Sequence, residues 1–169
     1  MKKNIEPYTK ESLILRLLTP EDLAFTLHWR NHPAHRIWFN SIHIITEKEH
    51  KKWFNEYRLR DNDFIFIITN KDAHLIGQLS LYNVDYKNKS AIFGRLLVNP
   101  EFSNKGHMKK AILLAIKLAK EIIGLHSLSL EVKINNEKAI HLYQSCGFLQ
   151  KKTNDNNNML KMHISLLRI

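Results

Sequence analysis

The stretch LLVNPEFSNKGHMKKAILLAIKLAKEII, residues 96–123, combines a strand, a polar loop and a long helix. The strand ends at Asn99-Pro100, because proline lacks the N–H group that a sheet ladder requires. From Met108 onward, apolar residues recur at the spacing of one helix face, while most of the lysines fall elsewhere. Gly124 then stands where helices commonly end. This succession predicts a buried strand followed by an amphipathic helix.

The polar loop of this stretch, Ser103 to His107, is a candidate phosphate-binding site. A strand, a loop and a helix in this order direct backbone N–H groups and the positive end of the helix toward one point. The loop contains a single glycine, Gly106, and the alternative is an ordinary connection in which Gly106 is a turn residue. The loop by itself leaves both interpretations open.

The chain of 169 residues fits a single domain over residues 1–169, large enough to bury a core. Its hydrophobic content of 44% and charged content of 25% are typical of a soluble globular protein. The only cysteine, Cys146, excludes an internal disulfide, gives no metal-binding pattern and favours a reducing compartment. No apolar signal segment follows Met1-Lys2-Lys3, and Lys117 interrupts the longest apolar helical run. We therefore predict a cytoplasmic protein without a membrane span and without a metal.

The formal net charge of +10 favours an anionic partner: a nucleic acid, a membrane surface or a small polyanion. The lysines are dispersed rather than gathered in one block, and no nucleic-acid motif accompanies them. A genomic bias is the alternative explanation, since the chain is also rich in Asn and Ile. We therefore expect neither a nucleic acid nor a membrane as the partner.

Local patterns predict the element order β-α-α-β-β-β-α-β-α-β-β, an α/β (α+β) fold. Thr19-Pro20 and the capping box Thr46 to Glu49 begin the first two helices, and Asn135-Asn136 caps the last. Strict alternation from Leu128 to Ile134 predicts a strand with one buried face. A turn-prone segment, 154–158, separates the two final strands. The expected strands cover residues 13–18, 64–69, 75–84, 91–98, 127–134, 148–152 and 159–167, and the helices 19–30, 46–60, 108–123 and 137–146.

This order and two local motifs resemble the GNAT superfamily of acetyl-CoA-dependent N-acetyltransferases. Residues 96–123 match its strand, pyrophosphate loop and helix, and Asn136-x-x-Ala139-x-x-x-Tyr143-x-x-x-Gly147-Phe148 resembles its C-terminal acetyl-CoA signature. The resemblance covers nearly the whole chain and implies a mixed, mostly antiparallel sheet of about seven strands flanked by four helices. The loop departs from the usual Gln/Arg-x-x-Gly-x-Gly/Ala, because Ser103, Gly106 and Met108 stand there. Met108 occupies a position that is normally small.

A second resemblance, within the superfamily, is to the nucleotide-sugar N-acetyltransferases of pseudaminic-acid biosynthesis. The residues that carry it are Trp29-Arg30-Asn31-His32-Pro33, Trp38, the segment ending at His50, and residues 125–132. This resemblance implies acetylation of the 4-amino group of a UDP-linked 4-amino-4,6-dideoxy sugar. GNAT enzymes that act on other amines or on protein N-termini share an Arg-Asn motif after the first helix, so these acceptors are alternatives. The resemblance leaves open whether the chain forms a homodimer.

The GNAT resemblance implies a site for acetyl-CoA. Backbone amides at the helix start are expected to hold the diphosphate, and the backbone of the preceding strand is expected to pair with the pantetheine amides. A strand N–H near Leu97 or Val98 would stabilise the oxyanion, and Asn136 would meet the pantetheine arm. The expected cofactor-binding residues are Leu96, Leu97, Val98, Asn104, Lys105, Gly106, His107, Met108, Lys109 and Asn136.

Tyr143 is the expected general acid for the departing thiolate, a role that the resemblance implies. Its place on an apolar stripe with Ile140 also fits a core aromatic. The candidate bases are His50 and Glu131, although either also fits a surface or network residue, and a weakly basic amine needs only water. The expected acceptor-binding residues, for which helix termination and core packing are the alternative, are Arg30, Asn31, His32, Trp38 and His50. A non-catalytic module that binds CoA or nucleic acid is the alternative from another functional class.

Overall fold

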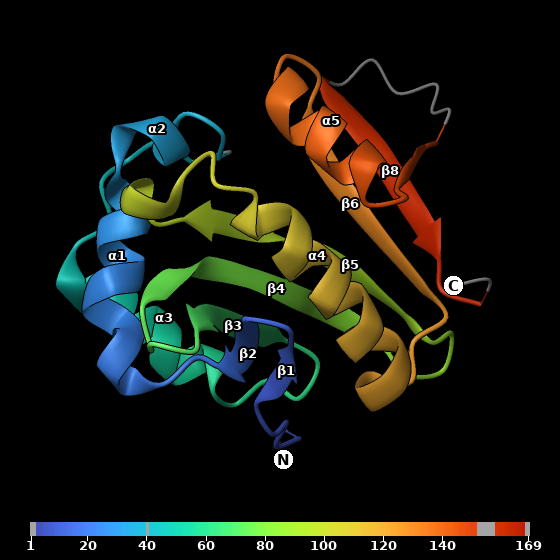
Figure 1. Ribbon diagram of the computed structural model, residues 1–169. Helices are drawn as coiled ribbons and strands as arrows, with labels where there is room; N and C mark the ends of the chain where they lie inside the picture. Colours follow the sequence, from blue (N-terminus) through green and yellow to red (C-terminus); the bar gives the residue numbers. More distant parts are fainter. Residues whose placement is uncertain (1–2, 40, 152–157, 168–169) are drawn as a thin grey trace.

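A computed structural model describes residues 3–39, 41–151 and 158–167 (Figure 1). Its strands are β1 (Tyr8–Lys10), β2 (Leu13–Leu17), β3 (Phe64–Asn70), β4 (Leu75–Asp85), β5 (Ser90–Val98), β6 (Ser127–Lys133), β7 (Leu149–Gln150) and β8 (Met159–Ser165). Its α-helices are α1 (Leu23–Asn31), α2 (Pro33–Arg36), α3 (Glu47–Tyr57), α4 (His107–Leu118) and α5 (Glu137–Ser145). Short 3₁₀ turns cover Pro20–Asp22 and Pro100–Phe102, and a π-helical turn, Ala119–Ile123, extends α4.

The eight described strands form one sheet in the order β1-β2-β3-β4-β5-β6-β8-β7. Every neighbouring pair is antiparallel except β5 and β6, which are parallel. This parallel pairing is short, because it joins only residues 90–92 to residues 127–129. Beyond it the two strands diverge (Figure 1). The predicted mixed, mostly antiparallel sheet is confirmed, and its divergence at β5 and β6 divides it into two parts.

The sheet is covered on both faces, as β3 shows. Six of its seven residues are buried, and successive side chains of a strand point to opposite faces. Phe64 and Phe66 belong to the main core, which includes the apolar face of α4. Ile65 and Ile67 belong to a second core with Phe54 of α3. The amphipathic helix predicted from Met108 therefore covers one face of the sheet, and α3 covers the other.

The predicted helix starts agree with the observed caps. The N–H of Glu49 donates to Thr46 Oγ1 at 3.3 Å, while its carboxylate accepts from the Thr46 N–H at 2.7 Å. Asn136 Oδ1 accepts from the Ala139 N–H at 3.2 Å and so caps α5. Gly124 ends the helical segment with φ 83°.

Two details differ from the sequence prediction, and a third falls outside the described residues. The short elements β1 and α2 were not expected, so the structure has eight strands and five α-helices instead of seven and four. Ile134 was predicted on the buried face of β6, but it is 53% exposed because the strand ends at Lys133. Residues 154–157 of the predicted turn lie outside the described residues. None of the helices in the described part of the chain is long and apolar enough to cross a membrane.

Candidate active site

The divergence of β5 and β6 opens a cavity of about 300 Å³, which we call the cleft. One wall is β5, the opposite wall is β6 with the start of α5, and the segment after α2 covers it. The lining residues are His35, Trp38, Phe39, Tyr82, Phe93, Gly94, Arg95, Leu96, Leu97, Glu131, Val132, Lys133, Asn136, Ala139, Tyr143 and Met159. Leu96 and Leu97 on one wall therefore face Asn136, Ala139 and Tyr143 on the other, whereas Val98 is not among the lining residues.

The wall formed by β5 contains a β-bulge. Gln78 pairs with Leu97 and Ser80 pairs with Gly94, so a single residue of β4 faces both Arg95 and Leu96. Arg95 has φ 50°, in the left-handed region. A bulge bends its strand and redirects the following peptide groups. Because the pairing with β6 stops at residue 92, the backbone from residue 93 to residue 98 forms an edge that an extended ligand with amide groups could join.

The candidate phosphate loop precedes α4. Gly106 has φ 77° and caps the helix, and Asn104 has φ 61°. The amine of Lys138, in the first turn of α5, donates to Asn104 Oδ1 at 2.6 Å. The loop is thus tied to the helix that carries Asn136 and Tyr143. Met108 is half-buried and packs against the main core, so its bulk fills the core.

Tyr143 lies in the cleft and is 8% exposed. Burial raises the pKa of its phenol to about 12, with smaller contributions from Cys146 and Tyr82. The phenol is therefore protonated at neutral pH and carries a proton that it can donate. Asn136 lines the same cleft while it caps α5. The two residues of the C-terminal motif are thus brought together.

A second cavity of about 390 Å³, which we call the side pocket, lies between the sheet and the helices α1 and α3. Its lining residues are Thr26, Arg30, Phe39, His43, Ile45, Glu49, His50, Trp53, Gln78, Arg95 and Leu97. Three of them, Phe39, Arg95 and Leu97, also line the cleft. The two cavities therefore adjoin at the bulge of β5. A ligand that donates a chemical group from one cavity and a ligand that accepts it in the other cavity would meet at this wall.

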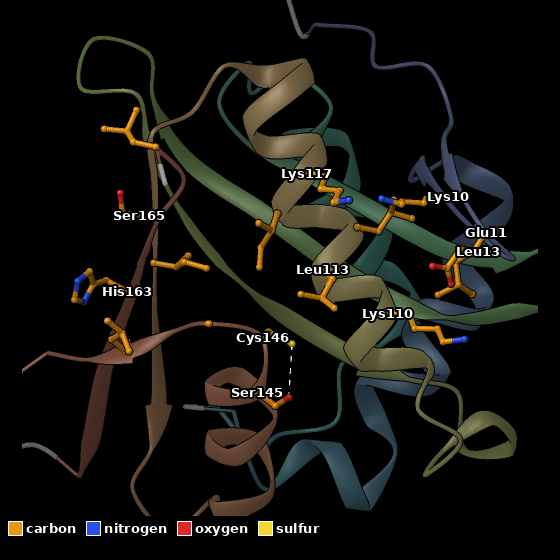
Figure 2. A pocket seen from close by; sticks show the side chains of 16 residues that line it. Lys10, Glu11, Leu13, Lys110, Leu113, Lys117, Ser145, Cys146, His163 and Ser165 are labelled. Atoms are coloured by element: carbon orange, nitrogen blue, oxygen red, sulfur yellow. Dashed lines mark hydrogen bonds between the residues drawn. The ribbon is translucent and has the colours of Figure 1, made fainter. Parts of the chain in front are cut away.

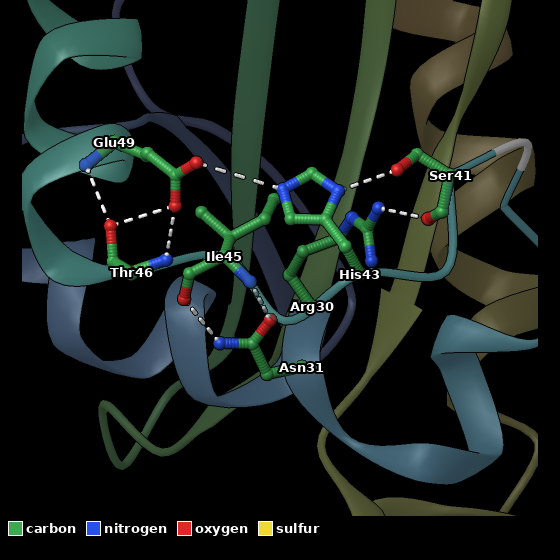
Figure 3. Close-up of polar contacts among 7 residues, drawn as sticks. All are labelled: Arg30, Asn31, Ser41, His43, Ile45, Thr46 and Glu49. Atoms are coloured by element: carbon green, nitrogen blue, oxygen red, sulfur yellow. Dashed lines mark hydrogen bonds and ion pairs between the residues drawn. The ribbon is translucent and has the colours of Figure 1, made fainter.

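Arg30 lines the side pocket and is incompletely paired (Figure 3). Its guanidinium lies 3.9 Å from the ring centre of Phe39, and Nη2 donates to the Ser41 carbonyl at 2.8 Å. Nη1 is buried, and within residues 3–39, 41–151 and 158–167 it has no hydrogen-bond partner. Burial, followed by repulsion from Arg36, lowers the pKa of Arg30. A buried, unpaired cationic nitrogen is unfavourable, and a negative group of a ligand would relieve it.

The two candidate bases lie in different cavities. His50 lines the side pocket, where its Nε2 is 2.9 Å from Thr26 Oγ1 and its ring stacks on Trp53 with ring centres 5.0 Å apart. Burial lowers the pKa of His50 below the usual 6.5, so its imidazole is neutral at pH 7. Glu131 lines the cleft, is exposed, and has a carboxylate oxygen 3.9 Å from the amine of Lys161.

The other predicted acceptor residues differ in position. Trp38 lines the cleft. The amide of Asn31 exchanges two hydrogen bonds, at 2.8 and 2.9 Å, with the backbone of Ile45, which lines the side pocket (Figure 3). His32 Nδ1 accepts from the N–H of Ala34 at 3.3 Å and so caps α2. Asn31 and His32 border neither cavity, so they shape the segment around the side pocket.

Sequence reasoning did not find Arg95, Phe39 or Glu49. The signal for Arg95 was present, because it is the only charged residue in the predicted strand 91–98. In the sequence, Glu49 is recognisable only as part of a capping box. In the structure, its carboxylate also lies 3.8 Å from the imidazole of His43 in the side pocket (Figure 3). Phe39 carries no signal, since its place depends on how the segment after α2 folds back.

A larger cavity, of about 900 Å³, lies elsewhere, over the outer face of α4 (Figure 2). Leu113, Lys117, Cys146 and His163 are among its lining residues, and none of the predicted site residues borders it. Size alone therefore does not locate the site. The cleft and the side pocket are the better candidates, because they combine a free strand edge, a buried phenol and a guanidinium with one nitrogen that has no partner among the described residues.

A splayed mixed sheet with a phosphate-type loop and a buried phenol in the gap is an arrangement suited to acyl transfer from a thioester. Residues 12–149 match the family model of the Acetyltransferase (GNAT) domain, and the chain therefore belongs to this family of acetyl-CoA-dependent N-acetyltransferases. The expected class of enzyme is thereby confirmed.

Two relatives and one solved structure show what this chain is similar to. Spermidine N(1)-acetyltransferase of Vibrio cholerae is 29% identical over 140 residues, which cover 82% of this chain and 80% of that protein. Acetyltransferase PseH of Campylobacter jejuni is 28% identical over 131 residues, covering 78% and 79%. The crystal structure of the Vibrio cholerae spermidine N-acetyltransferase with CoA and spermine superposes with a TM-score of 0.84 at 25% identity, over 93% of this chain and 97% of that chain.

Proposed function

We propose that this enzyme transfers the acetyl group of acetyl-CoA directly to the primary amine of a nucleotide-linked amino sugar. The expected acceptor is a UDP-4-amino-4,6-dideoxy sugar, bound in the side pocket while the thioester occupies the cleft. The single observation that carries this choice is the buried Nη1 of Arg30 in the side pocket, which has no hydrogen-bond partner among the described residues. A diphosphate is a suitable partner for it, because a guanidinium binds phosphate oxygens in a planar, two-pronged geometry.

The charge of the side pocket supports an acceptor with a negative group. Arg30 contributes an incompletely paired guanidinium to its wall, whereas the guanidinium of Arg95 is already paired with Asp63, and Glu49 contributes the one carboxylate among the described lining residues. A polyamine carries several positive charges and would need more carboxylates than cations around it. The second candidate acceptor is nevertheless a polyamine, because two of the comparisons are with enzymes named for spermidine. Trp38, at the edge of the cleft, could stack on a uracil ring or a sugar.

The donor would be held mainly by backbone groups. We assign the diphosphate of acetyl-CoA to the amides from Asn104 to Lys109, at the positive end of α4. The pantetheine amides would pair with residues 96–98 along the free edge of β5, and Asn136 would contact the same arm. A backbone N–H at Leu97 or Val98 would then point at the carbonyl oxygen as negative charge develops on it.

Tyr143 would protonate the departing thiolate. A phenol whose pKa is about 12 is a weaker acid than a thiol with an ordinary pKa of about 8.5, so donation to a fully hydrated thiolate would be uphill. In the cleft, however, the burial that raises the phenol pKa also raises that of the thiol, because both charged forms lose water. The proton transfer is then closer to balanced, and it completes the collapse of the tetrahedral intermediate to amide and free thiol.

Loss of the proton from the attacking amine can follow two routes. His50 is neutral and lies in the side pocket, whereas Glu131 lies in the cleft. A sugar amine of low basicity is neutral in water without either residue. A protein N-terminus is a further alternative acceptor. The alternative from another functional class is a module that binds CoA without catalysing a reaction.

A thiol-release screen tests the proposal. The purified chain is given acetyl-CoA with a UDP-4-amino-4,6-dideoxy sugar, with spermidine, and with a peptide that has a free N-terminus. We expect turnover with the nucleotide sugar, and an Arg30→Met variant should raise KM for it by about 10-fold or more. Arg30→Lys is the matched control that keeps the charge but removes the fork. Robust turnover with spermidine or peptide alone would refute the sugar-nucleotide assignment, and no turnover with any amine would favour the binding module.

A further inference from the structure

The bulge residue of β5 is held by a buried ion pair that reaches across the sheet. Arg95 Nη1 donates to Asp63 Oδ1 at 2.7 Å, and the side chain of Asp63 is only 5% exposed. A second guanidinium, that of Arg60, lies 3.5 Å from the other carboxylate oxygen and is 45% exposed. Asp63 stands directly before β3, two strands away from Arg95 in the sheet order. The carboxylate thus fixes a side chain that belongs to the wall between the two cavities.

The backbone of the same residue is also held. The side-chain amide of Gln78, a residue only 7% exposed, donates to the Arg95 carbonyl at 3.3 Å. The guanidinium of Arg95 lies 4.3 Å from the ring centre of Tyr82, which lines the cleft. A non-glycine residue with φ 50° is unfavourable unless its surroundings stabilise it. Asp63, Gln78 and Tyr82 together supply that stabilisation.

The consequence for the cleft follows from strand geometry. Successive peptide groups and side chains of a strand alternate in direction. One residue inserted or deleted before Leu97 would therefore reverse the direction in which the side chain and peptide groups of Leu97 point. The bulge at Arg95 therefore determines which backbone groups of Leu96 and Leu97 point into the cleft. An ion pair that fixes the bulge also fixes the alignment of the thioester.

We propose that Asp63 and Arg95 form a positioning pair for acetyl transfer, in which Asp63 acts through Arg95 and touches no reactant. This inference rests on the proposed function to the extent that residues 96–98 align the donor. Loss of the pair should leave the fold intact but allow the bulge to relax. The chemical step should then slow more than acetyl-CoA binding weakens, because the diphosphate site at α4 is separate from the bulge.

The chain contains a matched control. Arg16 and Asp22 form an ion pair at the same distance of 2.7 Å, with side chains 30% and 5% exposed against 29% and 5% for Arg95 and Asp63. Asp22 lines neither the cleft nor the side pocket. Asp63→Asn and Asp22→Asn therefore remove carboxylates of equal exposure from ion pairs of equal length, although Asp22 also accepts from the backbone N–H and hydroxyl of Thr19, and both substitutions should lower the melting temperature. Arg95→Lys preserves the positive charge of the positioning pair but replaces the planar, two-pronged guanidinium with a single amine.

The experiment measures kcat and KM for acetyl-CoA, together with hydrogen–deuterium exchange of amides 93–98, well below the melting temperature. For Asp63→Asn we expect a fall in kcat of about 10²-fold, a KM within about threefold of the wild type, and faster exchange confined to β5. Arg95→Lys should lie between this variant and the wild type, and Asp22→Asn should retain kcat. Equal kcat values for Asp63→Asn and Asp22→Asn, or unchanged exchange in β5, would overturn the positioning role. If the wild-type protein acetylates no amine, the proposed function fails, and the exchange data still decide whether Asp63 fixes the bulge.

Discussion

The phenol ring of Tyr143 meets the ring of Phe93 edge to face across the cleft, with ring centres 6.0 Å apart and an angle of 78° between their planes. Phe148 contacts Tyr143 in the same manner, also at 6.0 Å. One of these partners lies on β5 and the other directly follows the turn after α5. The orientation of the phenol is therefore fixed by aromatic packing against one residue of the cleft wall, Phe93, and one residue of the main core, Phe148, which is the condition that a proton donor needs.

Replacement of this phenol is the first test of the mechanism. Tyr143→Phe should reduce kcat by roughly 10²-fold while acetyl-CoA affinity stays nearly constant, because only the proton donor is removed. Tyr57 is the matched control: it is 2% exposed, burial also raises its pKa to about 12, and it accepts the Ile65 N–H at 3.0 Å. Tyr57→Phe should lower stability without lowering kcat. Steady-state kinetics with calorimetry of acetyl-CoA binding would reveal either result, and an unchanged rate for Tyr143→Phe would remove it as the acid.

Lys133 bridges the mouth of the cleft, since its amine donates to the carbonyls of Ile37 at 2.9 Å and Phe39 at 3.4 Å. Lys133→Met should release the segment that carries Phe39 and raise KM for the acceptor by about 10-fold, in line with the loss of charge-assisted hydrogen bonds. Lys51→Met is the control, because the Lys51 amine pairs with the exposed carboxylate of Glu47 on α3, away from both cavities. Steady-state kinetics gives the KM for the acceptor in each variant. Equal KM values in the two variants would contradict the bridging role of Lys133.

Gly106 and Gly124 allow the phosphate loop to be tested at constant backbone strain. Both have positive φ, 77° and 83°, and an added Cβ would meet nothing within 4 Å at either position. Alanine at each should therefore lower the free energy of unfolding by a similar amount, about 1–2 kcal/mol. Only Gly106→Ala should also weaken acetyl-CoA binding, because it disturbs the amides at the start of α4. Urea denaturation and calorimetry measure the two effects, and equal acetyl-CoA affinities in both variants would argue against a phosphate site in this loop.

Stability should depend on pH through the buried His50 and the half-buried His35. Burial lowers the pKa of His50 and of His35 below 6.5, with an additional unfavourable contribution from His32 in the second case. Between the folded and unfolded pKa values, the unfolded chain binds more protons than the folded chain. The stability contributed by the neutral rings is thus complete above about pH 6.5 and is lost as the pH falls below it. Urea denaturation at pH 7.5 and 5.0 measures this loss, which His50→Gln should reduce; identical losses in variant and wild type would contradict the assignment.

The parts of the fold that depend on local signals could be predicted from the sequence. The caps at Thr46 and Asn136 act within three residues of themselves, and the alternation from Leu128 is a property of one strand. The elements that were missed are short and depend on distant partners. The three residues of β1 are a strand only because they pair with β2, and α2 has only four residues.

The residues of the candidate site also divide into those that local motifs predict and those that depend on distant parts of the chain. The facing of Leu97 and Tyr143 could be anticipated, because both belong to motifs with a fixed place in the chain order. The bulge at Arg95 could not be located, since a bulge is a relation between two strands and leaves no mark at a single position. The unpaired nitrogen of Arg30 likewise arises from how the chain after α2 folds back over α1.

The short parallel pairing of β5 and β6 also has a thermodynamic consequence. It leaves unpaired backbone inside the sheet, and this opening exists only in the folded chain. A ligand that fills it binds the native state and not the unfolded state, so the free energy of unfolding rises with the logarithm of the ligand concentration. At 100 times the dissociation constant this contribution is about 2.7 kcal/mol. The enzyme with acetyl-CoA bound would then resist thermal and chemical unfolding better than the free enzyme.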